Sequence, residues 1–173
     1  MFTKILIATD GSSHGKKAMD LGLELAANSS ASVVLVSSVS DESLPPELKK
    51  LAQSEHLGEA AKVPDPPLNI MGNMATDLGV GAELQRAYRV RTEIAQHLLE
   101  MAKNDARRRG IKDIVTHVLD GDPAKAILDA AKKAGADCII LGSRGLGGLK
   151  GLLLGSVSHK VSQMAPCTCI TVR

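Results

Sequence analysis

Hydrophobic positions along the chain follow two periods that alternate from one end to the other. Short runs of apolar and β-branched residues, typical of buried strands, occur at 5–8, 33–39, 114–119, 138–141 and 167–172. Stretches between these runs carry apolar residues every three or four positions, which is the period of an amphipathic helix. Strands that alternate with helices predict a parallel sheet with right-handed crossovers. We therefore expect an α/β fold with an open parallel sheet and helices on both faces.

Polar residues and glycines mark the ends of the predicted helices. The cluster Thr-Asp-Gly-Ser at 9–12 is a turn and cap, and Asn-Ser-Ser at 28–30 ends the helix that follows. Asp122 is a predicted N-cap with Pro123 at the first helical position, and Gly135 is a natural stop. A last helix is expected over 156–164. Apolar residues at helical spacing in the first helix are Ala18, Leu21, Leu25 and Ala26.

About 70 residues separate the second predicted strand from the third, far more than one crossover helix needs. An amphipathic pattern predicts a long helix over roughly 83–109, and its three terminal arginines complement the helix dipole. A short helix is expected around 48–52. Residues 41–82 read as a long variable insertion with Pro-rich and Gly-rich stretches, and a lid, a docking segment and a disordered loop all remain open.

Composition narrows the class of protein. The chain has 173 residues and a mass of 18.1 kDa, which suits one domain with a sizeable core. Aromatic residues make up 1% of it, so stacking platforms for nucleic acid bases are not expected. The net charge of +2 argues against both a nucleic acid and a membrane surface as partner. No apolar run approaches the length of a membrane span.

Cysteine usage and the N-terminus bear on the compartment. Three cysteines cannot all pair within one chain, which fits a reducing environment. A strand pattern begins by Lys4 and leaves no room for a signal peptide. We therefore expect a cytoplasmic protein. A metal site at Cys167 and Cys169 is disfavoured because the sequence shows no further ligands nearby.

The glycine-rich stretch 142–156 carries the strongest indication of chemistry. It directly follows the apolar strand 138–141, where backbone N–H groups can converge on a phosphate. A P-loop is excluded because Lys150 is followed by Gly151 rather than by Ser or Thr. A dinucleotide fingerprint is excluded because Lys150 also occupies the place of its third glycine. A flexible surface loop is the alternative interpretation.

The spacing of this stretch carries a family resemblance. Gly142, two residues, Gly145, nine residues and then Gly155-Ser156 resembles the nucleotide motif of the ATP-binding universal stress proteins. Segments 4–12, 121–127 and 165–173 resemble the same family in the same order. The resemblance covers residues 2–40 and 84–173.

The resemblance implies a fold, a ligand and a set of site residues. It implies a universal stress protein domain over 1–173, strand order 3-2-1-4-5, and a homodimer formed through the last, edge strand. It implies an adenine nucleotide, ATP, with an accompanying Mg²⁺ or Mn²⁺ left open. The implied contacts are Ala8, Thr9 and Asp10 for adenosine, Val39 for adenine, and Gly142, Arg144, Gly145, Gly155, Ser156 and Val157 for ribose and phosphates.

Several of these residues also have a plain structural interpretation. Asp10 suits a capping turn, Val39 an ordinary core position, and Ser156 an N-cap. Lys150 lies within the loop and is expected to be solvated, and His14 is expected to be an inert surface histidine.

The catalytic signals in the sequence are weak. Asp10 is the only carboxylate clearly placed at the expected site, with Asp122 a remote second, and no triad is legible from the spacing. We therefore expect an ATP-binding regulator in signalling or stress response, acting on an unknown protein partner, and no catalytic residues. A slow ATP hydrolase, and a dimeric interaction module for another adenine nucleotide such as cyclic AMP or for none, remain as alternatives.

Overall fold

The computed structural model describes residues 1–39, 46–55, 57, 75–146 and 154–173. The chain divides into two compact units, one made of Met1–Ser40 with Ala95–Arg173 and the other of Asp41–Ile94. The elements in chain order are β1 (Lys4–Ala8), α1 (Ser13–Ser29), β2 (Ser32–Val39), α2 (Pro46–Ser54), α3 (Ala75–Arg108), β3 (Ile114–Asp120), α4 (Pro123–Ala134), β4 (Cys138–Gly142), α5 (Ser156–Met164) and β5 (Thr168–Val172).

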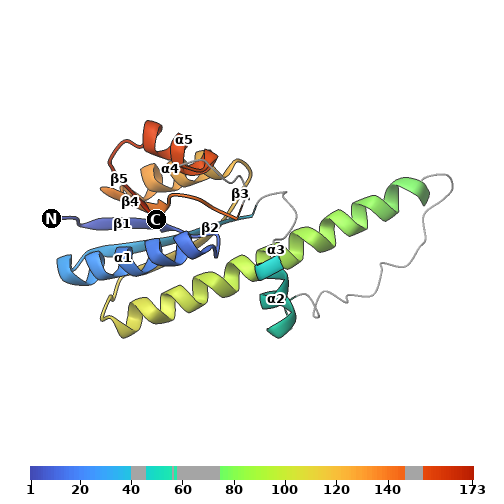
Figure 1. Cartoon of the computed structure of the whole chain (residues 1–173), viewed down its shortest axis with the longest axis horizontal. Helices are drawn as coiled ribbons and strands as arrows, with labels where there is room; N and C mark the ends of the chain where they lie inside the picture. Colours follow the sequence, from blue (N-terminus) through green and yellow to red (C-terminus); the bar gives the residue numbers. More distant parts are fainter. Residues whose placement is uncertain (40–45, 56, 58–74, 147–153) are drawn as a thin grey trace. The chain divides into compact units, whose positions relative to one another are not determined.

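The first unit is built on one parallel sheet. Among the described residues, five strands pair in the order β3-β2-β1-β4-β5, as expected. Side chains of the central strands alternate between two cores. Ile5 and Ile7 pack in a core with α1 and the end of α3, whereas Leu6 and Ala8 pack in a core with α4 and α5. Helices therefore cover both faces of the sheet (Figure 1).

The caps of α1 and α4 lie where the sequence predicted them. Ser12 caps α1, its hydroxyl accepting from Gly15 N at 3.0 Å, and Ser30 ends the helix in a left-handed conformation. Asp122 caps α4 by accepting from Lys125 N at 2.8 Å, with Pro123 following, and Gly135 ends it at φ 67°.

The buried stripe of α1 differs from the predicted one. Leu21 and Leu25 are only partly buried, and Met19, Gly22 and Leu23 lie deeper. A Cβ at Gly22 would stand 2.6 Å from Cδ1 of Ile7. This close approach orients α1 so that the face containing Gly22 and Leu23, rather than Leu21 and Leu25, meets the sheet.

The second unit contains α2 and the first part of α3. Leu48 and Ala52 are buried in α2, which confirms the expected short helix. The long helix α3 begins at Ala75 rather than near 83, so the predicted start is wrong by about two turns. The amphipathic pattern placed the start near 83, but the helix continues back through Gly79 and Gly81, since a glycine inside a helix costs only about 1 kcal/mol relative to alanine and need not end it.

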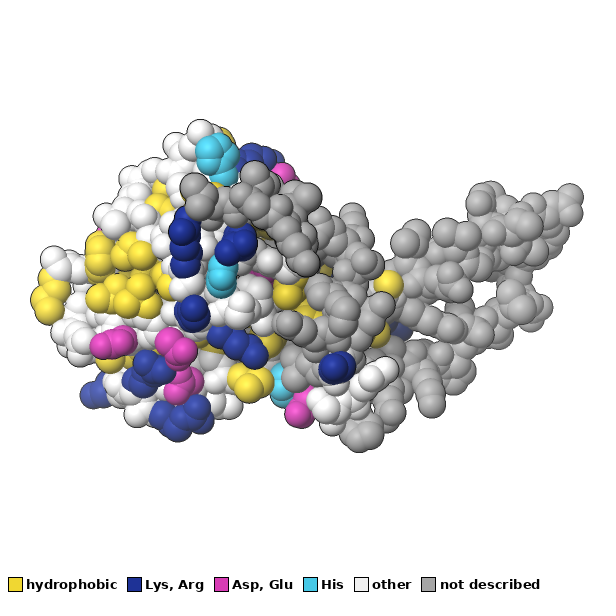
Figure 2. Space-filling view, in the orientation of Figure 1, with side chains coloured by type: hydrophobic (Ala, Val, Ile, Leu, Met, Phe, Trp, Pro, Cys, Tyr) yellow, Lys and Arg dark blue, Asp and Glu magenta, His cyan; other side chains and the backbone are white. Residues whose placement is uncertain are grey.

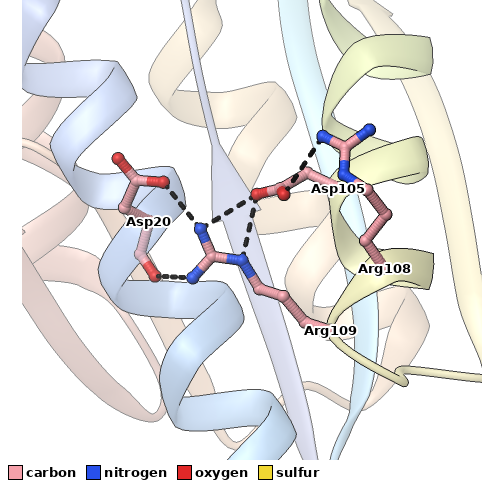
Figure 3. Close-up of polar contacts among 4 residues, drawn as sticks. All are labelled: Asp20, Asp105, Arg108 and Arg109. Atoms are coloured by element: carbon pink, nitrogen blue, oxygen red, sulfur yellow. Dashed lines mark hydrogen bonds and ion pairs between the residues drawn. The ribbon is translucent and has the colours of Figure 1, made fainter.

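A polar cluster joins α1 to the end of α3 within the first unit (Figure 3). The Arg109 guanidinium lies 2.9 Å from Asp20 Oδ1 on α1 and 3.0 Å from Asp105 Oδ2 on α3. Arg109 also donates to the backbone oxygen of Asp20 at 3.4 Å, and Arg108 contacts Asp105 at 3.3 Å. These contacts fix the end of α3 against α1.

Within the described residues, no helix is long and apolar enough to cross a membrane.

Candidate functional site

The carboxyl ends of β1 and β4 lie side by side, because Ala8 and Leu141 are partners in the parallel ladder. The loops that follow these strands therefore meet at one edge of the sheet, where ligands bind in open α/β folds. Residues 9–12 follow β1, residues 143–146 follow β4, and α5 begins at Ser156. The predicted phosphate-binding loop thus lies beside the predicted adenosine-binding turn.

Asp10 joins these two loops. Its Oδ1 accepts from Ser12 N and its Oδ2 accepts from Leu146 N, each at 3.0 Å. Hydrogen bonds to a carboxylate are stronger than those between neutral groups. Asp10 therefore holds the loop after β4 onto the turn after β1, in addition to forming the capping turn that its position suggested.

Two glycines make room for that carboxylate. A Cβ at Gly145 would stand 2.5 Å from Asp10 Oδ2, and a Cβ at Gly15 would stand 2.9 Å from Asp10 Oδ1. Any side chain at either position would displace Asp10. The structure therefore requires glycine at position 145 whether or not a ligand binds.

The packing around position 142 also requires glycine. A Cβ there would stand 2.8 Å from both Gly15 N and the carbonyl carbon of His14, which are backbone atoms and cannot turn aside. The residue allows β4 to end directly against the first turn of α1. A substitution at Gly142 is therefore expected to disturb the fold as well as any ligand.

The start of α5 forms the other side of the loop. Gly155, rather than Ser156, is the N-cap, and it offers no side-chain hydrogen bond to the first turn. Gly155 N donates to Ser143 O at 2.8 Å, which draws the helix start against the loop. Ser156 is exposed and Val157 partly exposed. An uncapped helix start leaves backbone N–H groups and the positive end of the helix dipole available to an anion.

The remaining predicted residues occupy the same edge with different exposure. Ala8 and Val39 are 8% and 5% exposed, and this burial fits the interpretation of Val39 as a core valine. Thr9 is partly exposed and accepts from Gly11 N at 3.2 Å. Arg144 is exposed. Lys150 lies outside the described residues.

Serine and histidine residues outside the predicted set of ligand contacts complete the site. Ser12 Oγ donates to Arg144 O at 3.4 Å, and Ser158 Oγ lies 2.9 Å from Gly142 O and 3.0 Å from Ser143 O. Ser143 Oγ lies 3.2 Å from His14 Nδ1. Small hydroxyl residues carry little pattern of their own, so the sequence indicated only Ser12, by its cap position, and more weakly Ser158, by its place just after the glycine-rich stretch.

Other ionisable groups take no part in these contacts between the loops. Asp122 caps α4 and forms an ion pair with Lys160 at 3.1 Å. The hydrogen bond from Lys125 N, followed by the one from the Lys160 side chain, lowers the pKa of Asp122. Burial, followed by the nearby Cys167, raises the pKa of Cys138 to about 11, so its thiol stays protonated. Burial also raises the pKa of Cys169. In the described ranges, no three His, Cys, Asp or Glu side chains form a group that suits a metal ion.

The chain is similar in sequence and in fold to proteins of one family. Residues 1–173 match the model of the Universal stress protein family. The chain is 33% identical over 176 residues to the universal stress protein YxiE of Bacillus subtilis (strain 168), with 100% of both chains covered.

Solved structures share the fold at lower identity. A universal stress protein UspA from Lactobacillus plantarum superposes with a TM-score of 0.69 at 20% identity, covering 99% of this chain and 97% of that one. A universal stress protein in complex with cAMP gives 0.59 at 22% identity, with coverage of 99% and 97%. A universal stress protein from Archaeoglobus fulgidus in complex with dAMP gives 0.56 at 17% identity, with coverage of 99% and 98%.

Proposed function

We propose, from the premise that this chain belongs to the universal stress protein family, that it binds ATP and acts as a nucleotide-dependent regulator in signalling or stress response. The observation that carries this proposal is the meeting of three parts at one sheet edge. These are the turn at Asp10, the loop 142–146 and the uncapped start of α5. Together they present backbone N–H groups and a helix dipole to an anion, as phosphate sites do.

Another adenine nucleotide is the second candidate ligand. Two structures with the same fold are described as complexes with cAMP and with dAMP. A binding series of ATP, ADP, AMP and cyclic AMP by isothermal titration calorimetry decides between them. Micromolar binding of ATP, with weaker binding of cyclic AMP, is the expected result. Absence of binding to all four by folded protein would contradict the proposal.

Gly155 offers a sharper test than Gly142. A Cβ at Gly155 would lie 3.5 Å from Arg144 Cα and 3.7 Å from Gly145 N, which are ordinary contacts. Gly155→Ala therefore fits the free protein but places a methyl group 3.7 Å from Gly145 N, beside a backbone N–H of the loop. We expect ATP affinity to fall about 10-fold, the scale of one hydrogen bond to a charged group. Gln163→Ala, exposed on the same helix, is the matched control.

Catalysis is proposed to be slight. Phosphoryl transfer needs metal ions, cationic side chains and a positioned water to stabilise the transition state. Both oxygens of Asp10 already accept backbone hydrogen bonds, so this carboxylate is committed to holding the loop. Phosphate release with Mg²⁺ or Mn²⁺ should stay far below one turnover per second. Faster turnover that disappears in Gly155→Ala would favour the hydrolase.

We also propose that β5 forms a homodimer by pairing with a second copy. Within the described residues β5 pairs only with β4, and an unpaired strand edge is a template for another strand. A two-fold arrangement would satisfy the outward backbone groups of both copies. An unknown protein partner and a cytoplasmic location complete the proposal.

A further inference from the structure

We infer that His14 is a phosphate-contacting residue of this site, so that it sets the preference for phosphorylated nucleotides over adenosine. The inference rests on the proposed function and goes beyond its predicted contacts, in which His14 had no part. His14 lies in the first turn of α1, and its side chain is half-buried. Its Nδ1 is 3.2 Å from Ser143 Oγ, which belongs to the loop between Gly142 and Gly145.

The hydrogen bond to Ser143 bears on which ring nitrogen can meet a ligand. When the serine hydroxyl donates to Nδ1, the neutral imidazole carries its proton on Nε2. Among the described residues, Nε2 has no hydrogen-bond partner. An anion in the loop would select this tautomer, because Nε2–H is then a donor to a phosphate oxygen.

Ser143 is a fixed partner for this ring. Its N donates to Val172 O at 2.6 Å, and its O accepts from Gly155 N at 2.8 Å and from Ser158 Oγ at 3.0 Å. Its side chain is 1% exposed. The serine is thus held by β5 and by the start of α5, and it orients the imidazole relative to the loop.

The close fit at Gly142 also holds His14 in place. A Cβ at Gly142 would stand 2.8 Å from the carbonyl carbon of His14 and 3.0 Å from its Cβ. The backbone of His14 therefore lies directly against the end of β4, where the loop begins. Lys, Arg and His side chains gather over the region around the start of α1 in the view of Figure 2, which favours an anionic ligand there.

A ligand series on matched variants tests the inference. Adenosine, AMP, ADP and ATP are titrated into wild-type protein, His14→Ala and His14→Gln, and into His117→Ala, which replaces an exposed histidine of β3. For His14→Ala we expect ATP and ADP affinity to fall about 10-fold, the scale of one hydrogen bond to a charged group. Adenosine affinity should not change, and His117→Ala should bind all four ligands as wild type does.

The possible outcomes separate a phosphate contact from a positioning role. Equal loss for adenosine and ATP would overturn the inference and leave His14 as a support for the loop. Unchanged ATP affinity in His14→Ala would also overturn it while leaving the proposed function intact. Wild-type protein that binds none of the ligands would overturn the proposed function, and the inference with it. Melting temperatures of the variants identify any loss caused by misfolding, in which case His14→Gln decides.

Discussion

Arg109 illustrates how one side chain joins parts of the chain that are distant in sequence. It contacts an aspartate on α1 and another on α3, and its own side chain is 32% exposed (Figure 3). Partly exposed ion pairs contribute little each, but a planar guanidinium can serve two carboxylates at once. The geometry, rather than the charge alone, is therefore expected to matter.

Substituting Arg109 by lysine tests this. We expect Arg109→Lys to lower the free energy of unfolding by about 0.5–1 kcal/mol, because an ammonium group cannot keep both contacts in the same geometry. Urea denaturation at low and high salt measures the effect, which should shrink at high salt. Arg108→Lys is the control, since Arg108 is mostly exposed and, in the part of the chain that the structure describes, pairs with one carboxylate. An equal loss in both variants would contradict the argument.

Asp137 predicts a dependence of stability on pH. Burial alone would raise its pKa, but hydrogen bonds from the Thr3 hydroxyl and from the N–H groups of Thr3 and Lys4 outweigh it, and the net pKa is lowered. A lowered folded pKa contributes stability that is present above the unfolded value of about 3.9 and is lost as pH falls through the folded value.

Asp137→Asn measures this contribution. The variant should unfold more easily than wild type at pH 7, because an amide accepts the same bonds more weakly. The difference should shrink as the pH falls below about 4. Chemical denaturation across this range provides the measurement. Asp129→Asn, on the exposed side of α4, should show no comparable change with pH. A difference that stays constant down to the lowest pH would argue against the carboxylate as its source.

At the scale of elements, the sequence predicted what depends on local chemistry. The caps at Ser12, Asp122 and Gly135 were predictable because each residue type satisfies backbone groups by itself. The facing stripe of α1 was not, because it depends on contact between Gly22 and Ile7, which are distant in sequence. The start of α3 was placed too late because the amphipathic pattern begins near 83, whereas the helix itself extends back through two glycines to Ala75.

The candidate site divides in the same way. Glycine spacing in 142–156 predicted a loop and a helix start, and the structure brings Gly145 against Asp10 and Gly155 against Ser143. The hydrogen bond between Ser143 and His14 joins residues 129 positions apart, and no sequence pattern at either residue predicts such a contact. Long-range polar contacts of small side chains therefore had to come from the structure.

Gly135 allows a clean measurement of one cap. It has φ 67°, and a Cβ there would meet nothing within 4 Å, so any cost of substitution comes from the backbone alone. We expect Gly135→Ala to destabilise the protein by about 1 kcal/mol. Gly135→Asn should cost less, because asparagine tolerates the left-handed region better. Thermal unfolding compares the two, and equal losses would show that the conformation at this position relaxes.

At the scale of the whole molecule, the β5 edge decides how copies can associate. Ser143 N donates to Val172 O, so the backbone groups of Val172 and, by alternation, Ile170 face β4. Those of Cys169 and Thr171 therefore face away from the sheet. A proline that removes an outward N–H is expected to affect association, whereas a proline that removes an N–H facing β4 is expected to affect folding.

Two proline variants separate the effects. Thr171→Pro should remove an outward N–H and shift the proposed dimer toward about 18 kDa monomer, measured by light scattering, without breaking the ladder to β4. Ile170→Pro should instead remove a bond to β4 and lower the melting temperature. A dimer that survives Thr171→Pro in the folded protein would show that association uses another surface.

The alternation along β5 also determines how fast each amide hydrogen of the strand exchanges with solvent. The amides of Ile170 and Val172 are closed into the sheet, so their hydrogens exchange with deuterated water only when the strand opens. The amides of Cys169 and Thr171 have no such protection in a single copy. Exchange along β5 should therefore alternate between slow and fast in dilute protein. At concentrations where two copies pair, the fast positions should slow while the slow ones keep their rate, which makes this strand its own internal reference for association.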